Sequence, residues 1–61
     1  MSKKILLVDD DTDLVATLSQ ALKMNDYVVV TAYSGAEGLQ KLLAEKPDLM
    51  ILDVMMETDT A

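Results

Sequence analysis

Two groups of aspartates could do chemistry, because each group follows directly after a short apolar run. Asp9 and Asp10 come after residues 5–8. Asp53 comes after residues 49–52. A short apolar run of this kind is typical of a strand that is buried on both faces of a parallel sheet. If the two strands lie side by side and parallel, their acidic ends meet at one edge of the sheet.

The chemistry of such an edge would be that of a cation and a phosphoryl group. Two carboxylates about 4 Å apart repel by roughly 4 kcal/mol at an effective dielectric constant near 20. A small hard cation such as Mg²⁺, or Mn²⁺ in its place, relieves that repulsion and takes oxygen ligands. A carboxylate left partly free beside the cation could then attack a phosphoryl group. The alternative is that Asp9, Asp10 and Asp53 only end their strands at a polar rim.

Composition narrows the classes of function. The 61 residues allow one small domain, and the net charge of −6 argues against binding nucleic acid or an anionic membrane through a charged face. The chain has no cysteine and no histidine, so disulfides, thiolate zinc sites and imidazole chemistry are excluded. No apolar run approaches the roughly 20 residues that span a bilayer. We therefore expect a cytoplasmic protein whose small core is supported by a metal or by self-association.

Between the first two strands the pattern predicts a helix. Asp11 or Thr12 can act as its N-cap, Asp13 suits its first turn, and Asn25 suits the left-handed position after its end. The residues expected to face the sheet are Leu14, Val15, Leu18, Ala21 and Leu22. The residues expected on the other face are Thr12, Thr17, Ser19, Gln20 and Lys23.

The following segment predicts a second strand and a second helix. Residues 27–32 are rich in β-branched side chains, and residues 34–37 form a capping box with Ser34 and Glu37. The expected inner face of this helix is Ala36, Leu39, Leu42 and Leu43, with Gly38 as a weak point. Pro47 stops the helix, and Asp48 is expected in the turn that follows. The order β-α-β-α-β with short connections predicts parallel strands and right-handed crossovers.

Several of these stretches together resemble receiver domains of two-component response regulators. They are residues 4–11 (KILLVDDD), Tyr27 at the start of the second strand, residues 32–38 (AYSGAEG) and residues 47–56 (PDLMILDVMM). The similarity covers nearly the whole chain. The resemblance implies an α/β fold, the β-α-β-α-β half of a flavodoxin-like parallel sheet with strand order 2-1-3.

The resemblance also implies roles for single residues. Asp53 matches the phosphoacceptor, Asp10 a direct Mg²⁺ ligand, and Asp9 the other acidic residue, which often acts through water. Met55 matches the position whose backbone carbonyl completes the protein's share of the metal shell. A sensor histidine kinase or a small phosphodonor would supply the phosphoryl group, which makes the chain a phosphoacceptor in a phosphorelay and not a turnover enzyme. Glu57 stands where many receivers have proline, and adds negative charge there.

The resemblance further leads us to expect that residues 1–61 are the amino-terminal half of a receiver. The strands and helices of the second half, with their phosphoryl-binding hydroxyl, lysine and switch aromatic, would be missing. The apolar edge of residues 49–52 would then favour a homodimer in which this strand pairs antiparallel with its copy. Packing through uncovered faces is the alternative geometry. A self-assembling structural half-fold without activity is the alternative function, and an inhibitory partner that docks on a receiver or kinase is a third.

Overall fold

The computed structural model describes residues 2–52, which form an α/β unit with the element order β-α-β-α-β. The elements are β1 (Lys4–Val8), α1 (Thr12–Met24), β2 (Val28–Ala32), α2 (Gly35–Glu45) and β3 (Leu49–Leu52). All strand pairs within this part of the chain are parallel, and the strand order is β2-β1-β3. The predicted fold class and the 2-1-3 order are confirmed. The first strand begins one residue earlier than predicted, at Lys4, and the second begins one residue later, at Val28.

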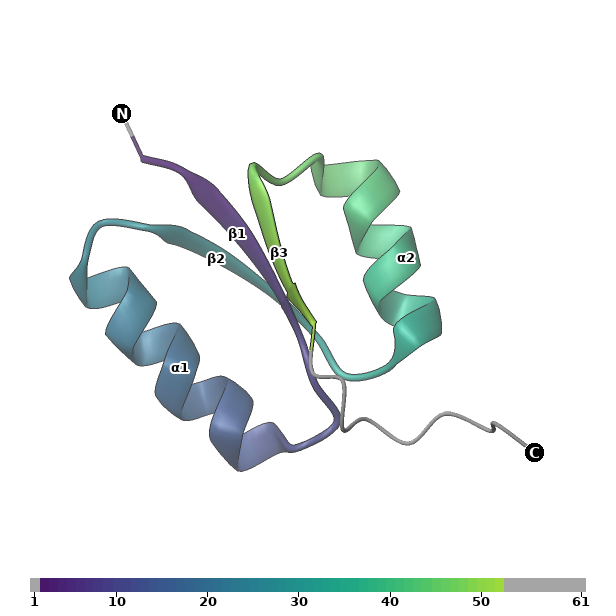
Figure 1. Cartoon of the computed structure of the whole chain (residues 1–61), viewed down its shortest axis with the longest axis horizontal. Helices are drawn as coiled ribbons and strands as arrows, with labels where there is room; N and C mark the ends of the chain where they lie inside the picture. The colour runs from purple at the N-terminus through teal and green to yellow at the C-terminus, as the bar shows by residue number, and fades with distance from the viewer. Residues whose placement is uncertain (1, 53–61) are drawn as a thin grey trace.

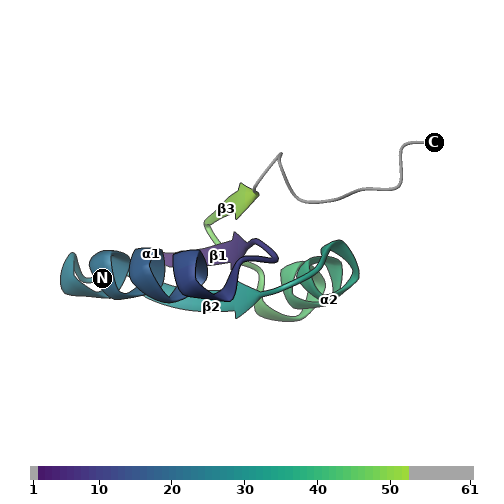
Figure 2. The ribbon, with the colours of Figure 1, turned by 90° about the horizontal axis from the view of Figure 1, so that it is seen from below.

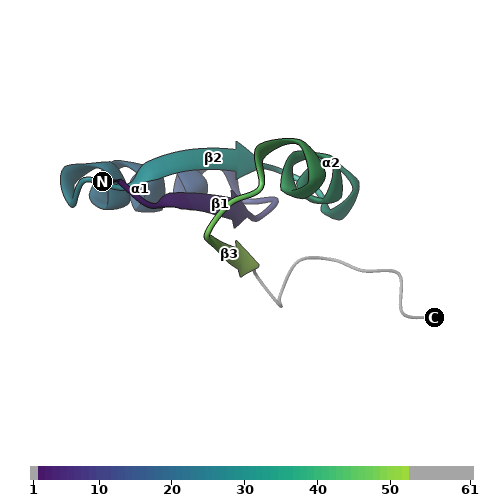
Figure 3. The same ribbon diagram turned by 90° about the horizontal axis from the view of Figure 1, so that it is seen from above.

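The two helices lie on opposite faces of the sheet, as the ribbon shows (Figure 1). Right-handed crossovers require this, because the first crossover moves from β1 to β2 and the second passes back over β1 to β3. Seen from the two ends in Figures 2 and 3, the helices flank β1 and β2, whereas β3 stands out beyond them. Within residues 2–52, β3 therefore packs only against β1.

The core is built on the central strand. The side chains of Ile5, Leu6, Leu7 and Val8 are all at most 3% exposed. Because side chains alternate along a strand, Leu6 and Val8 share one face, where they pack with the residues Val30, Ala32 and Leu42 on the α2 side. Ile5 and Leu7 take the opposite face, which α1 covers with the buried side chain of Val15.

The start of β3 is attached to the start of β1 by two hydrogen bonds. The backbone N–H of Asp48 donates to the carbonyl of Lys4 at 2.8 Å. The backbone N–H of Lys4 donates to the carboxylate Oδ2 of Asp48, also at 2.8 Å. The resulting register pairs Ile5 with Leu49 and Val8 with Leu52. Asp48, expected to serve only the turn, therefore also fixes which residues of the two strands lie level.

Helix α1 begins at its aspartate cap and ends in a left-handed residue. The carboxylate of Asp11 accepts hydrogen bonds from the backbone N–H groups of Asp13 and Leu14, both at 3.1 Å, so Asp11 and not Thr12 is the N-cap. At the other end, the prediction for Asn25 is wrong. Asn25 has φ −104°, and the left-handed residue is Asp26, with φ 69°. The side-chain amide of Asn25 instead donates to the carbonyl of Ala21 at 2.9 Å, which occupies one of the free carbonyls of the last turn.

Helix α2 has the predicted cap with one difference. The hydroxyl of Ser34 accepts the backbone N–H of Glu37 at 3.1 Å, as in a capping box. The carboxylate of Glu37 reaches back to the N–H of Tyr33 at 2.9 Å, one residue before the cap. The helix ends at Glu45, because the residue before Pro47 is disfavoured in the right-handed helical region. Lys46 instead adopts the left-handed conformation that commonly ends a helix, with φ 49°.

The predicted inner face of α1 is wrong in part. Val15 is buried and Leu22 is half-buried, but Leu14 and Leu18 are 41% and 37% exposed. Ser19, expected on the outer face, is only 8% exposed. Within residues 2–52 the helix contacts β1 and β2 only, so part of its apolar stripe stays accessible to solvent.

The predicted inner face of α2 is wrong for most of its residues. Leu42 is half-buried, but Leu39 and Leu43 are 58% and 68% exposed and Ala36 is exposed. The residue that lies closest to the sheet is Gly38, which is buried. A Cβ on Gly38 would stand 2.9 Å from Cγ2 and 3.1 Å from Cγ1 of Val8. Gly38 is therefore the point where the helix backbone approaches β1, and not a weak point of the helix.

We predict that Gly38→Ala lowers the free energy of unfolding by about 1 kcal/mol. Alanine improves helix propensity by about 1 kcal/mol, but overpacking a filled core commonly costs about 1–3 kcal/mol, and Val8 is a stiff β-branched neighbour. Urea unfolding measures the change. In a Val8→Ala background the loss should disappear, and Gly35→Ala at the exposed start of the same helix serves as the control. A Gly38→Ala chain that gains the full propensity term would contradict the close approach.

Candidate functional site

The carboxyl end of β1 carries the first predicted site residue, Asp9, in a buried position. Its side chain is 3% exposed, and its backbone N–H donates to the carbonyl of Ala32 at 3.1 Å, which continues the pairing of β1 with β2. Its carboxylate Oδ1 accepts the backbone N–H of Asp11 at 2.9 Å. A nearly buried carboxylate needs such partners, because an unpaired charge is costly to remove from water. Asp9 is thus held rigidly by the backbone on both sides of it.

The three consecutive aspartates have three different environments. Asp9 is buried and tied to the loop, whereas Asp11 uses its carboxylate to cap α1. Asp10 lies between them and is exposed, and its side chain makes no hydrogen bond or ion pair to residues 2–52. Of this group, Asp10 has the carboxylate that is most accessible to a bound ion. Asp11 and Asp13 serve the start of the helix, as predicted.

Asp53 and Met55 lie outside the described residues, so their predicted roles are not tested by the structure. What the structure does show is the register next to them: Val8 and Leu52 are paired residues on adjacent parallel strands. The residues that follow them in the sequence are Asp9 and Asp53.

The donor set fits a hard divalent cation. Within residues 2–52 no group of three or more acidic, histidine or cysteine residues stands close enough to hold a metal. Asp9 and Asp10 contribute two carboxylates at one strand end. Only one oxygen of the Asp9 carboxylate accepts a hydrogen bond from the backbone, so the other is available to a cation. Mg²⁺ commonly takes one or two protein carboxylates and keeps several waters. Asp9 and Asp10 are accordingly the described residues that would hold it.

Residues that position the site include Lys4 and Asp48, for which the sequence analysis predicted no contact between elements. The ammonium of Lys4 lies 3.2 Å from the carboxylate of Glu45 and 3.1 Å from its carbonyl, which ties the end of α2 to the start of β1. Asp48 then holds β3 level with β1. In the sequence these residues are visible only as a lysine just before the first apolar run and an aspartate just before the third. The sequence does not indicate which residues they contact.

An open parallel sheet with helices on both faces defines an α/β protein, a class in which ligands generally bind beyond the carboxyl ends of the strands. Comparison with known families then gives the particular class. Residues 5–60 match the model of the response regulator receiver domain. The chain belongs to the response regulator receiver domain family. The resemblance drawn from the sequence is confirmed.

Individual relatives support the same assignment. The chain is 50% identical over 56 residues to the alkaline phosphatase synthesis transcriptional regulatory protein PhoP of Bacillus subtilis, covering 92% of this chain and 23% of that protein. It is 43% identical over 56 residues to the response regulator MprA of Mycobacterium ulcerans, covering 92% and 24%. It is 40% identical over 55 residues to the transcriptional regulatory protein PrrA of Mycobacterium tuberculosis, covering 90% and 24%. The chain spans about a quarter of the length of these relatives.

Neither α1 nor α2, the helices of the described part, combines the length and the apolar character that crossing a membrane demands.

We predict that Asp11→Ala lowers the free energy of unfolding by about 1 kcal/mol, because it removes the oxygen that accepts two backbone N–H groups of the first turn. Asp11→Asn should lose only a few tenths of that, because the asparagine amide oxygen can still cap the helix. Thermal unfolding of both variants at the same pH makes the comparison. Equal losses from alanine and asparagine would show that charge, and not capping, is what Asp11 contributes.

Proposed function

We propose that the chain accepts a phosphoryl group on Asp53, with Mg²⁺ held by Asp9, Asp10, Asp53 and the backbone carbonyl of Met55. The observation that carries this proposal is the β1–β3 register. It makes Val8 and Leu52 paired residues, immediately before Asp9 and Asp53 in the sequence. Membership of the receiver family supports phosphorelay signalling as the context.

The environments of the aspartates suggest how they divide the work. Asp10, which is exposed, would bind the cation directly, whereas Asp9 is already anchored to the loop and would act through water. The cation, Mg²⁺ or Mn²⁺, would screen the charge of the incoming phosphoryl group. An oxygen of Asp53 would form the new O–P bond as the bond from phosphorus to its donor breaks. A sensor histidine kinase or a small phosphodonor would be that donor.

The test is phosphorylation with a small phosphodonor, such as acetyl phosphate, in the presence of Mg²⁺. We predict that mass spectrometry finds the label on Asp53, that Asp53→Asn abolishes it, and that Asp10→Asn slows it by about a hundredfold, the usual cost of losing one stabilising group. Mg²⁺ should also raise the midpoint of thermal unfolding of the unchanged chain, but not of Asp10→Asn, because a ligand of the folded state stabilises it.

Asp13→Asn is the matched control, because it makes the same charge change in the same acidic stretch at a residue of α1. It should retain both the label and the stabilisation by Mg²⁺. A label on Asp9 or Asp10, or an equal loss in Asp10→Asn and Asp13→Asn, would overturn the assignment of these roles.

A second candidate function is structural: self-association of the chain through β3. The side chains of Leu49, Met50 and Leu52 are 54%, 38% and 49% exposed, although an apolar strand of this kind is typical of a sheet interior. Since Asp48 bonds to β1, the alternation along a parallel strand turns the backbone groups of Leu49 and Ile51 outward. Such an apolar edge is a template for another strand. We propose that a second copy of this chain can supply it.

The outward groups define one register for that pairing. With Leu49 opposite Ile51 of the second copy, both residues donate and accept across the new junction, and Met50 lies opposite its own copy. The junction is antiparallel, as a two-fold axis perpendicular to the sheet requires. Asp48 then faces Leu52 of the second copy, so no like charges oppose each other.

We predict that sedimentation equilibrium finds a dimer, with twice the 6.7 kDa of one chain. Leu49→Lys should shift it towards the monomer, because a charge on an edge strand blocks pairing. Leu43→Lys, at an exposed leucine of α2, tests packing through uncovered faces instead. A monomeric unchanged chain would remove the structural candidate and leave the phosphoacceptor proposal intact.

A further inference from the structure

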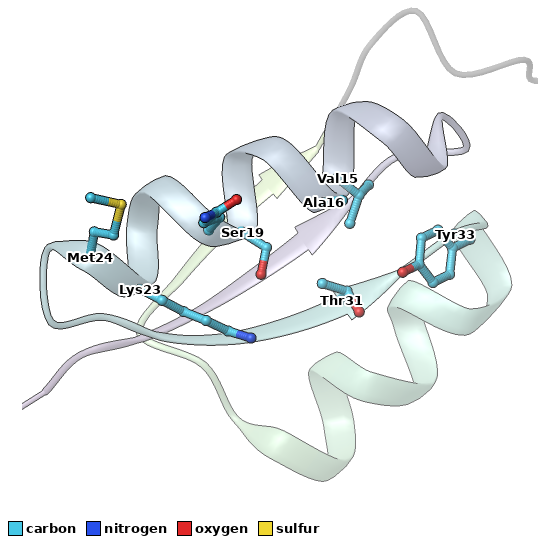
Figure 4. A pocket seen from close by; sticks show the side chains of 8 residues that line it. Val15, Ala16, Ser19, Lys23, Met24, Thr31 and Tyr33 are labelled. Carbon is cyan, nitrogen blue, oxygen red and sulfur yellow. The ribbon is translucent and has the colours of Figure 1, made fainter.

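A groove of about 570 Å³ lies between α1 and β2, on the side of the sheet away from α2 (Figure 4). One wall is formed by α1 residues that include Val15, Ser19 and Lys23. The other wall is formed by Thr31 at the end of β2 and by Tyr33 just after it. None of the acidic residues of the proposed phosphorylation site takes part in this lining. The groove therefore needs an explanation of its own.

The groove is lined by a serine whose hydroxyl has no protein partner and is open to the groove. Ser19 is 8% exposed, and its hydroxyl makes no hydrogen bond to residues 2–52. A helical serine or threonine often bonds the carbonyl four residues earlier, as Thr17 does with Asp13 at 3.0 Å. The close-up shows the Ser19 hydroxyl directed into the groove instead (Figure 4). The Ser19 hydroxyl is therefore free to bond to whatever occupies the groove, water or a ligand.

A cation points into the same space. In the described part of the chain, the lysine ion pairs join Lys4 to Glu45 and Lys41 to Glu37, and Lys23 has none. Figure 4 shows the Lys23 side chain running from the last turn of α1 towards β2, with its nitrogen over the β2 ribbon and below the Ser19 hydroxyl in this view. The Lys23 ammonium is therefore available to an anion, in a chain whose net charge is −6.

Two further hydroxyls complete the polar lining. Neither the Thr31 nor the Tyr33 side chain has a hydrogen-bond partner within residues 2–52. The oxygen of Tyr33 is directed towards Thr31 in the close-up, and the side chain of Val15 lies above them (Figure 4). The groove thus combines one ammonium and several hydroxyl donors with an apolar and aromatic wall. Binding sites for small molecules are lined in this way, by apolar surface with a few convergent polar groups.

We propose that this groove binds a small organic anion, with its carboxylate or phosphate group on Lys23 and Ser19 and its apolar part against Val15 and the ring of Tyr33. Ammonium and hydroxyl donors bind oxyanions through charge-assisted hydrogen bonds, which are the stronger kind. Thr31 and Tyr33 offer the next donors to the same group. Such a site would let a metabolite act on α1 independently of phosphorylation.

The test is titration of the ¹⁵N-labelled chain, without divalent cations, with phenyl phosphate and separately with benzoate, followed by amide NMR. Saturable shifts centred on Ser19, Lys23, Thr31 and Tyr33 are expected for at least one of the two probes. The probe that binds more tightly distinguishes a phosphate from a carboxylate ligand. Benzyl alcohol, which has the ring without the anion, should not saturate the site.

Two variants and one control make the result specific. Lys23→Gln should weaken binding at least fivefold, and Ser19→Ala should weaken it while leaving thermal stability unchanged or raised, because its hydroxyl has no partner to lose. Lys3→Gln makes the same charge change outside the groove and should bind as the unchanged chain does. Equal weakening by Lys3→Gln and Lys23→Gln, shifts that map elsewhere, or no saturation by either probe would overturn the proposal.

Discussion

The burial of β1 on both faces and at both edges is the constraint on which the rest of this structure depends. Leu6 and Val8 face α2, while Ile5 and Leu7 face α1, and all four are almost completely removed from water. Because each such side chain contributes roughly 1.5–3 kcal/mol when buried, the central strand dominates a core this small. Asp9, the first residue beyond the strand, is buried to the same degree, and its carboxylate is tolerated there because it accepts the backbone N–H of Asp11.

That burial also explains which parts of the fold could be predicted from sequence. Uninterrupted apolar runs, the Ser34–Glu37 pair and Pro47 are local signals, and they gave the right elements in the right order. Which face of each helix packs on the sheet could not be predicted from local signals. Leu14, Leu39 and Leu43 have helical spacing, but which of them meets the sheet depends on where each helix lies across β1 and β2. Gly38 shows the same limit, because its role depends on Val8, thirty positions earlier.

The candidate site also has features that the sequence predicts and features that depend on the folded structure. Because parallel strands end at the same edge, the sequence predicts that Asp9 and Asp10 converge with Asp53; Asp53 lies outside the described residues, so this convergence stays a prediction. The different surroundings of Asp9, Asp10 and Asp11 could not be predicted, because these depend on the turn into α1. One of the three carboxylates bonds the loop, one stays exposed, and one caps the helix. The position of Ser19 was predicted wrongly for another reason. Hydrophobic periodicity predicts that a serine lies on the outer face of a helix, but Ser19 lies on the side facing the sheet, next to the groove.

The two edges of the sheet differ in a way that bears on what each can do. Asp9 donates to Ala32, so the alternation along β2 turns the carbonyl of Thr31 outward, and there the ammonium of Lys41 binds it at 3.0 Å. A lysine on an edge strand's backbone is a common protection against pairing with another chain. No charged residue occurs within β3, and within residues 2–52 no side chain bonds the outward groups of Leu49 and Ile51. A further strand can therefore pair at the β3 edge, whereas Lys41 hinders such pairing at the β2 edge. The groove between α1 and β2 has the size of a site for a small ligand.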